Sequence, residues 1–180
     1  MKVHSNLILI GGSSQNVGKT TFTIDILKKY SSTNSIIAIK TSCHFHGILD
    51  TDIVIENNSE FTITEETVTN TGKDSSRMLK AGASRVFFIQ AKDEFIGNAF
   101  SYISEKLGND DLIICETASL RKHLVPEFFI ALVNDKNEEL SENKIILRKA
   151  DIMIEGYLNN KENIGSTVEI INNKWILKKQ

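Results

Sequence analysis

The sequence predicts an α/β fold, in which a mainly parallel sheet carries helices on both faces as a three-layer sandwich. Three observations predict it. Short apolar runs alternate with amphipathic helical patterns, most of these runs are continuously apolar, and a glycine-rich segment joins the first run to the first helix. Continuous apolar strands are typical of parallel sheets covered on both faces. We expect a single domain over residues 1–180, because no repeat or linker divides the chain.

The opening elements are a strand, a loop, a helix and a second strand. The run "LILI" within residues 3–10 is typical of a buried strand. Over residues 19–30 the apolar side chains fall on one arc and the charged ones lie opposite, which predicts a helix. "IIAIK", residues 36–40, reads as the next strand. A strand–helix–strand order predicts a crossover connection and parallel pairing.

The remaining elements are less regular. Residues 48–68 predict a small antiparallel excursion with a turn at "NNSE", and residues 166–179 predict a hairpin around Asn172-Asn173, at an antiparallel edge of the sheet. A helix is expected over 93–107, capped by Asp93 and ended by Gly108. The other expected elements are a short helix closed by Gly82 in "GKDSSRMLKAG" and strands at "RVFFIQ", "DLIIC", "FFIALV" and "ADIMI".

Composition excludes several classes of protein. The formal net charge of −2 leaves no general basic face, so we expect no nucleic-acid partner. No apolar stretch approaches the length of a membrane-spanning helix, and the short apolar run near the N-terminus does not resemble a secretory signal. Cys43 and Cys115 are the two cysteines, and free thiols in a cytoplasmic protein are the expectation for them.

The segment "GGSSQNVGKTTF", residues 11–22, has the chemistry of a phosphate-binding loop. Gly18 lets the backbone approach a phosphate, and the N–H groups of the loop and of the helix N-terminus can cradle its oxygens. Lys19 would reach the β- and γ-phosphates, and Thr20 would offer its hydroxyl to Mg²⁺. The nucleotide-binding residues expected here are Gly12, Ser14, Gln15, Asn16, Val17, Gly18, Lys19, Thr20 and Thr21.

The spacing of this loop departs from the standard pattern G-x-x-x-x-G-K-[ST]. The residue five positions before Gly18 is Ser13, and Gly12 lies six positions before it. A loop one residue longer can still curl around a phosphate, and the strand before it and the helix after it are the context that the mechanism requires. The alternative is an ordinary strand–turn–helix connection in which "GKT" occurs by chance.

Several motifs resemble known families of P-loop NTPases. "GSSQNVGKT" resembles the loop of dethiobiotin synthetases and cobyrinic acid amide synthetases, in which the first glycine has the same six-residue offset. The segments "IAIKTSCHFHG", "DSSRMLKAGA" and "DLIICE" are similar to the molybdopterin-guanine dinucleotide biosynthesis protein B family. The resemblance covers residues 7 to about 116 and departs from the family at Thr41, where the family has His, and after Glu116, where it has Gly.

The resemblance implies a shared parallel sheet, a nucleoside triphosphate bound with Mg²⁺, and a role in molybdopterin-type cofactor biosynthesis beside a protein partner. Dimers are common among these families, so we expect a homodimer. In them the glutamate at the position of Glu116 lies close to the metal. A carboxylate at the end of a buried strand can hold Mg²⁺, although it can equally cap the following turn.

Three further sets of residues are candidates for the site. Lys40 ends a strand and can hold a terminal phosphate or an acidic substrate, or it can be a solvated lysine. Asp52 can supply a second metal carboxylate, or it can be a turn residue, as can its neighbour Asp50. The residues in "CHFH", Cys43, His44 and His46, can ligate zinc, but a substrate-facing loop is the preferred interpretation.

The sequence therefore predicts Mg²⁺-dependent binding and hydrolysis of ATP or GTP, with Lys19, Lys40 and Glu116 as the catalytic residues. The base-reading signature N-K-x-D is not present in intact form, so the choice of base stays open. One alternative is an ATP-dependent ligase or carboxylase of the dethiobiotin synthetase type, acting on a small acid held by Lys40 and the "TSCHFHG" loop. The other is a nucleotide-binding regulator with little catalysis.

Overall fold

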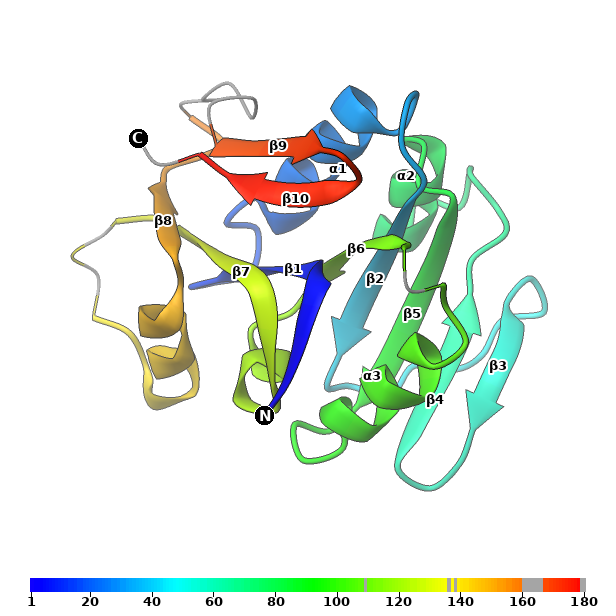
Figure 1. Ribbon diagram of the computed structural model, residues 1–180. Helices are drawn as coiled ribbons and strands as arrows, with labels where there is room; N and C mark the ends of the chain where they lie inside the picture. Colours follow the sequence, from blue (N-terminus) through cyan, green and yellow to red (C-terminus); the bar gives the residue numbers. More distant parts are fainter. Residues whose placement is uncertain (109, 136, 138, 160–166, 179–180) are drawn as a thin grey trace.

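The computed structural model of the chain describes residues 1–108, 110–135, 137, 139–159 and 167–178. Strands and helices alternate through most of this length (Figure 1). The elements are β1 (Lys2–Gly12), α1 (Lys19–Tyr30), β2 (Ile36–Ser42), β3 (Ile53–Asn57), β4 (Phe61–Glu65), α2 (Asp74–Lys80), β5 (Arg85–Ala91), α3 (Ile96–Ser104), β6 (Leu112–Glu116), the 3₁₀ helix η1 (Ser119–Lys122), β7 (Leu124–Val133), the 3₁₀ helix η2 (Glu142–Lys149), β8 (Ile152–Glu155), β9 (Val168–Ile171) and β10 (Lys174–Leu177).

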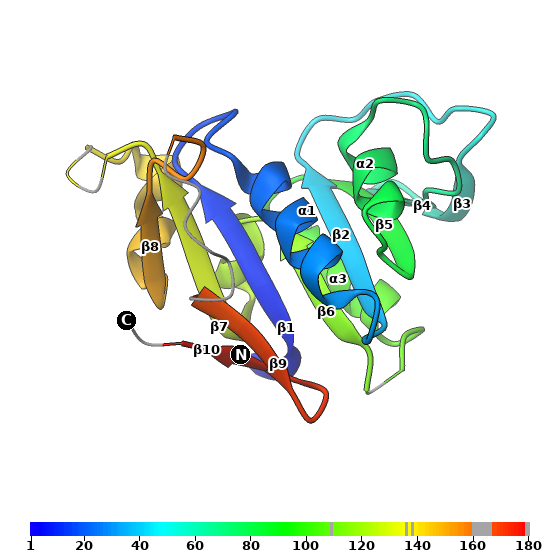
Figure 2. The same cartoon turned by 90° about the horizontal axis from the view of Figure 1, so that it is seen from above.

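Eight strands form one sheet in the order β3-β4-β5-β2-β6-β1-β7-β8. The six strands from β5 to β8 pair in parallel, and β3 and β4 add an antiparallel edge beside β5. The predicted mainly parallel α/β sheet is therefore confirmed. The antiparallel excursion predicted over residues 48–68 is the β3–β4 pair, which extends the sheet at its β5 side (Figure 2).

Two apolar clusters lie on opposite faces of this sheet, because successive side chains of a strand point to opposite sides. Ile8 and Ile10 of β1 belong to the cluster that contains the buried faces of α1 and α2. Leu7 and Leu9 belong to the cluster that contains α3. Figure 1 shows α1 and α2 above the sheet and α3 below it. No helix in the described part of the chain is long and apolar enough to cross a membrane.

The strand order brings three carboxyl ends together. The chain leaves β1 through α1 and enters β2, and β6 later fills the space between β1 and β2. In the resulting register, Glu116 at the end of β6 is the partner of Ile10 in β1 and of Lys40 in β2. Ligands of open α/β sheets bind beyond the carboxyl ends of the strands, at points where the strand order reverses. The loop after β1 lies at such a point.

The C-terminal hairpin forms as predicted, but its predicted place in the sheet is wrong. β9 and β10 pair with each other in a separate two-stranded sheet, and Asn172 and Asn173 have the left-handed φ values of 52° and 56° that a tight hairpin turn requires. The hairpin lies over the α1 face of the main sheet, where Trp175 is buried and its indole Nε1 donates to the carbonyl oxygen of Asn6. Residues 166 and 179, the ends of the predicted tail, are outside the described residues.

The third helix is shorter than predicted. It begins at Ile96 rather than near Asp93, and no side chain caps it. The Asp93 carboxylate accepts a hydrogen bond from Lys122 Nζ instead, at 2.8 Å, which ties the turn before α3 to η1. The prediction of Asp93 as a cap is therefore wrong, because a long-range ion pair takes the side chain that the local sequence offered to the helix. The helix buries Ile96, Ala99, Phe100 and Ile103 against the sheet.

Candidate functional site

The loop between β1 and α1 curls back tightly over the end of β1. Two of its residues have left-handed backbone conformations, Asn16 with φ 61° and Gly18 with φ 105°. Gly12 has no room for a side chain, because an added Cβ would lie 2.5 Å from Val17 Cγ1. Val17 itself is 4% exposed and belongs to the core beneath the loop. Gly12 thus allows the close contact that holds the longer loop against the end of β1.

The N-terminus of α1 opens towards this loop. The first helical hydrogen bond runs from the Phe22 N–H to the carbonyl oxygen of Gly18, at 2.8 Å. The N–H groups of residues 19–21 precede it and have no acceptor within the helix. Together with the helix dipole, such groups favour an anion.

Lys19 adds a cation at the same place. Its ammonium group donates to the carbonyl oxygen of Ser14 at 2.9 Å, so the side chain folds back over the loop. Burial lowers the pKa of Lys19, and the neighbouring charge of Glu116 raises it only in part. A cation that has lost water without gaining a full ion pair favours an anionic ligand.

Lys40 is the centre of a second cluster beside the loop. Its ammonium group donates to Glu116 Oε2 at 2.7 Å, to Asp74 Oδ2 at 2.8 Å and to Thr20 Oγ1 at 3.2 Å. These three bonds use all three of its protons. Burial alone would lower the pKa of Lys40, but the two carboxylates raise it above its usual value. The lysine therefore keeps its charge and neutralises the repulsion between the two acids.

The fold accounts for the position of each member of this cluster. Lys40 and Glu116 are partners on adjacent strands, Thr20 lies in the first turn of α1, and Asp74 is the first residue of α2. The Glu116 side chain is 1% exposed. Its Oε2 accepts from Lys40 and Thr20, whereas its Oε1 is buried and has no hydrogen-bond partner among the described residues. A buried carboxylate oxygen without a partner is costly, which indicates that a ligand or ion completes the site.

The oxygen atoms of this cluster are of the type that binds magnesium, and Oε1 of Glu116 is the one that Lys40 leaves without a partner among the described residues. A hydroxyl and two carboxylates are the hard ligands that Mg²⁺ prefers, and it commonly takes only one or two carboxylates from the protein. Thr20 and Glu116, both predicted as metal ligands, are in contact through a 3.2 Å hydrogen bond. Asp74 lies at the position that we expected Asp52 to fill. Asp52 instead accepts from Lys73 Nζ at 2.9 Å and from the N–H of Leu49.

A cavity of about 500 Å³ connects the loop to this cluster. Five of the predicted nucleotide-binding residues line it beside Gly18: Gln15, Asn16, Lys19, Thr20 and Thr21. Of the remaining three, Gly12 and Val17 support the loop from beneath, and Ser14 supplies the carbonyl oxygen that Lys19 contacts. Lys19, Lys40 and Arg77 bring three cations to the wall of this cavity. Lys40 and Arg77 are each paired with Asp74, so the positive charge that suits a polyphosphate comes from Lys19 and the N-terminus of α1.

Asp74 and Leu158 are the site residues that sequence reasoning missed. Asp74 lies within "GKDSSRMLKAG", where a short helix was predicted, but nothing local showed that this helix starts beside Lys40. Leu158 lies in the turn after β8 and lines the same cavity, and its side chain contacts the position where a Cβ on Gly18 would lie, at 3.2 Å. No pattern in the sequence pointed to it.

The "CHFH" segment leaves the carboxyl end of β2 and does not form a cluster with other ligands. Cys43 is exposed, and His46 lines a different cavity beside Lys40. Among the described residues, no group of three or more His, Cys, Asp or Glu side chains is arranged to hold a metal ion. The segment lies at the carboxyl end of β2, and its interpretation as a substrate-facing loop stays a prediction.

Comparison of the chain with models of protein families, with curated proteins and with solved structures found no match. The interpretation of the site depends on its own geometry and on the motifs in the sequence.

Proposed function

We propose that this protein is a Mg²⁺-dependent P-loop nucleoside triphosphatase with the three-layer fold of that class. One observation carries the proposal. The side-chain oxygen atoms of Thr20, Asp74 and Glu116 all contact the ammonium group of Lys40, next to the N-terminus of α1. The N-terminus of the helix and Lys19 lie at one end of the same cavity, and Lys40 and Arg77 line it further along. Phosphoryl transfer is catalysed mainly by positioning and charge neutralisation, and this set of groups supplies both.

Each side chain then has a stated role. The Lys19 ammonium exchanges the Ser14 carbonyl for phosphate oxygens, and the free N–H groups of the first turn of α1 donate to the same phosphates. Thr20 and Glu116 would hold Mg²⁺. Asp74 accepts from Lys40 beside them and so fixes the position of that ammonium group. When bound, Mg²⁺ would neutralise negative charge on the phosphate oxygens. Lys40 compensates the two carboxylates before and after turnover.

The wider role follows from the sequence resemblance. The segments "IAIKTSCHFHG" and "DSSRMLKAGA" support a role in cofactor biosynthesis, as in the molybdopterin-guanine dinucleotide biosynthesis protein B family. The two segments meet in space, because Lys40 of the first contacts Asp74 of the second. This contact supports the proposal that they form one site. A ligase acting on a small acid is less well supported, because the ammonium group of Lys40 already contacts two carboxylates.

Nucleotide-dependent stabilisation tests the proposal. A ligand at about 100 times its Kd adds roughly 2.7 kcal/mol to the free energy of unfolding. For a chain of this length that corresponds to a rise in Tm of about 5–10 °C. We expect this shift with ATP or GTP plus Mg²⁺, a smaller shift with EDTA, and the release of inorganic phosphate on incubation.

Two variants make the test specific. Lys19→Ala should lose most of the shift, because it removes the cation over the loop. Lys28→Ala is the matched control, since Lys28 is an exposed lysine on the same helix and its loss changes the net charge equally. The proposal fails if neither nucleotide shifts the wild-type Tm, or if Lys19→Ala keeps the full shift.

A further inference from the structure

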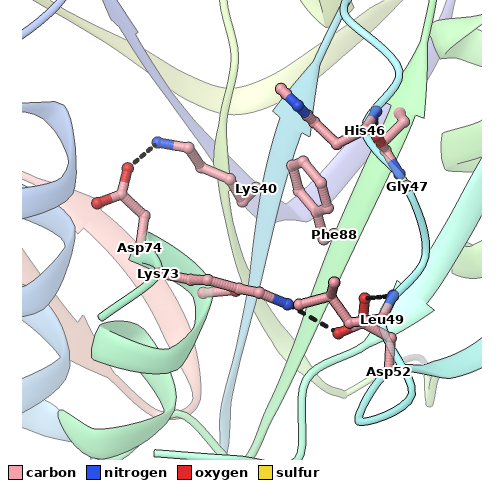
Figure 3. Close-up of a pocket in the computed structure, with 10 residues that line it drawn as sticks. Lys40, His46, Gly47, Leu49, Asp52, Lys73, Asp74 and Phe88 are labelled. Atoms are coloured by element: carbon pink, nitrogen blue, oxygen red, sulfur yellow. Dashed lines mark hydrogen bonds and ion pairs between the residues drawn. The ribbon is translucent and has the colours of Figure 1, made fainter. Parts of the chain in front are cut away.

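A second cavity, of about 460 Å³, adjoins the nucleotide cavity and shares Lys40 and Asp74 with it (Figure 3). We propose that this second cavity binds an uncharged small molecule with an aromatic ring and a hydrogen-bond acceptor. Binding of this molecule to the cavity does not depend on the proposed function. Only its position next to the terminal phosphate of a bound nucleotide rests on the proposed function.

The cavity lies where α2 begins, between that helix, β5 and the segment 46–52. Met78 of α2 packs in the same apolar cluster as Val86 of β5. Phe88 and Gln90 lie on the same face of β5 as Val86, because side chains of a strand alternate, and they extend beyond that cluster. Residues of the segment 46–52 line the same cavity, and Figure 3 shows Phe88 between this segment and Lys40.

Aromatic and aliphatic groups form most of the wall away from the lysines. The rings of His46 and Phe88 are within 27° of parallel, and their centroids are 6.4 Å apart. Leu49 lines the same wall and is 50% exposed. Aromatic rings stack best on other rings, with centroids about 4.5–7 Å apart. A ring that enters this cavity can therefore stack on Phe88 or His46, and so the wall favours an aromatic ligand over an aliphatic one.

The charges of the cavity are already neutralised in pairs. Lys40 Nζ lies 2.8 Å from Asp74 Oδ2, and Lys73 Nζ lies 2.9 Å from Asp52 Oδ1. No further lysine, arginine, aspartate or glutamate is among the residues that line it. An acidic or basic ligand would have to break one of these pairs, which leaves a partly buried charge without a partner at considerable cost. An uncharged ligand meets no such cost.

Gln90 supplies the directional contact. Gln90 is 2% exposed, and its side-chain Oε1 accepts a hydrogen bond from the backbone N–H of His46. Because that partner is a donor, the oxygen must face it, and the amide NH₂ group is left for another acceptor. This NH₂ group donates no hydrogen bond within the described residues and is not among their buried unpartnered atoms, so it is open to the cavity that Gln90 lines. A ring nitrogen or carbonyl oxygen on the ligand can accept from it in place of water.

Three simple probes test the chemical class: benzamide, benzoate and cyclohexanecarboxamide. They are similar in size, and each of the last two changes one property, the charge or the aromatic ring. We expect saturation-transfer NMR on the wild-type protein, without nucleotide, to detect benzamide binding and to give much weaker signals for the other two. The proposal is overturned if benzoate binds as strongly as benzamide, or if none of the three probes binds.

Variants locate the binding. His46→Ala removes an exposed ring from the wall and should weaken benzamide binding roughly three- to tenfold, the range expected for one aromatic pair. Phe88→Leu should do the same, and His46→Ala keeps the test usable if that variant unfolds. Phe45→Ala is the matched control, because Phe45 is an exposed ring of the same segment that does not line the cavity. Equal loss in the Phe45 and His46 variants would refute the assignment to this cavity.

The result of the probe test is independent of the result of the nucleotide test. The nucleotide test reads a shift in Tm, and the probe test reads NMR transfer without nucleotide. Benzamide binding without a nucleotide shift would leave the cavity assigned and the nucleotide proposal refuted, and the reverse result would refute only the cavity.

Discussion

Lys40 and Glu116 are register partners on the adjacent parallel strands β2 and β6, and their side chains are joined by a 2.7 Å hydrogen bond on the face that carries α1. The Glu116 side chain is 1% exposed, so this ammonium group is the main compensation for a buried negative charge. The pair links the sheet to the N-terminus of α1, because Thr20 contacts both residues. The effect of this cluster on the free energy of unfolding, and the pH dependence of that effect, can be measured.

Removal of the cation should be strongly destabilising. In Lys40→Met, Glu116 keeps a buried charge without its partner, and breaking a buried pair in this way costs about 3–5 kcal/mol. Urea unfolding of the variant and of the wild type measures this difference. The double variant Lys40→Met/Glu116→Gln should recover a large part of the loss, because no unpaired charge remains. A loss below about 1 kcal/mol in the single variant would show that the pair is not needed.

Acidification should remove the contribution of Asp74. Burial would raise the pKa of its carboxyl group, but hydrogen bonding and charge attraction from Lys40 hold it below the ordinary value of 3.8. Since the pKa is lower in the folded chain, the contribution is present above that ordinary value and is lost as the pH falls through the folded value. The stability difference between wild type and Asp74→Asn, measured by urea unfolding, should therefore be largest above pH 4 and should shrink below it. A difference that stays constant into that acid range would contradict the assignment.

Gly12→Ala should disturb the loop. The added Cβ would lie 2.5 Å from Val17 Cγ1, so the loop has to move away from β1, and overpacking of this kind costs about 1–3 kcal/mol. We expect the nucleotide-dependent rise in Tm to be lost as well. Gly47→Ala is the control, because no atom lies within 4 Å of the Cβ position there. If both variants keep the nucleotide response, the close contact at Gly12 is not required for binding.

The two cysteines should differ in reactivity. Cys43 is exposed, whereas Cys115 is fully buried and its pKa is raised, first by burial and then by the charge of Glu116. A thiol reacts as the thiolate, so we expect a disulfide reagent to modify one thiol per native chain and two per unfolded chain. Cys43→Ser should abolish the native reaction. Rapid modification of a second thiol in the native chain would contradict the burial of β6.

Local patterns in the sequence predicted the early part of the fold well. The helix over residues 19–30 was predicted from the spacing of its apolar residues, and the strand from residue 36 from a continuous apolar run. Phosphate binding by the loop, inferred from its glycines and its lysine, stays a prediction. The cap at Asp93 was predicted wrongly, since Lys122, far along the chain, competes for the same carboxylate.

The sequence by itself determined most of the strands and helices, since these depend on residues a few positions apart. Only the tertiary structure decided that Asp74, rather than Asp52, meets Lys40, and that Phe88 and Gln90 of an apolar-looking strand line a cavity. It also decided that the C-terminal hairpin lies on a face of the sheet rather than at its edge. The physical reason is that strand order and register bring distant residues together, and these depend on how the whole chain packs its two apolar faces.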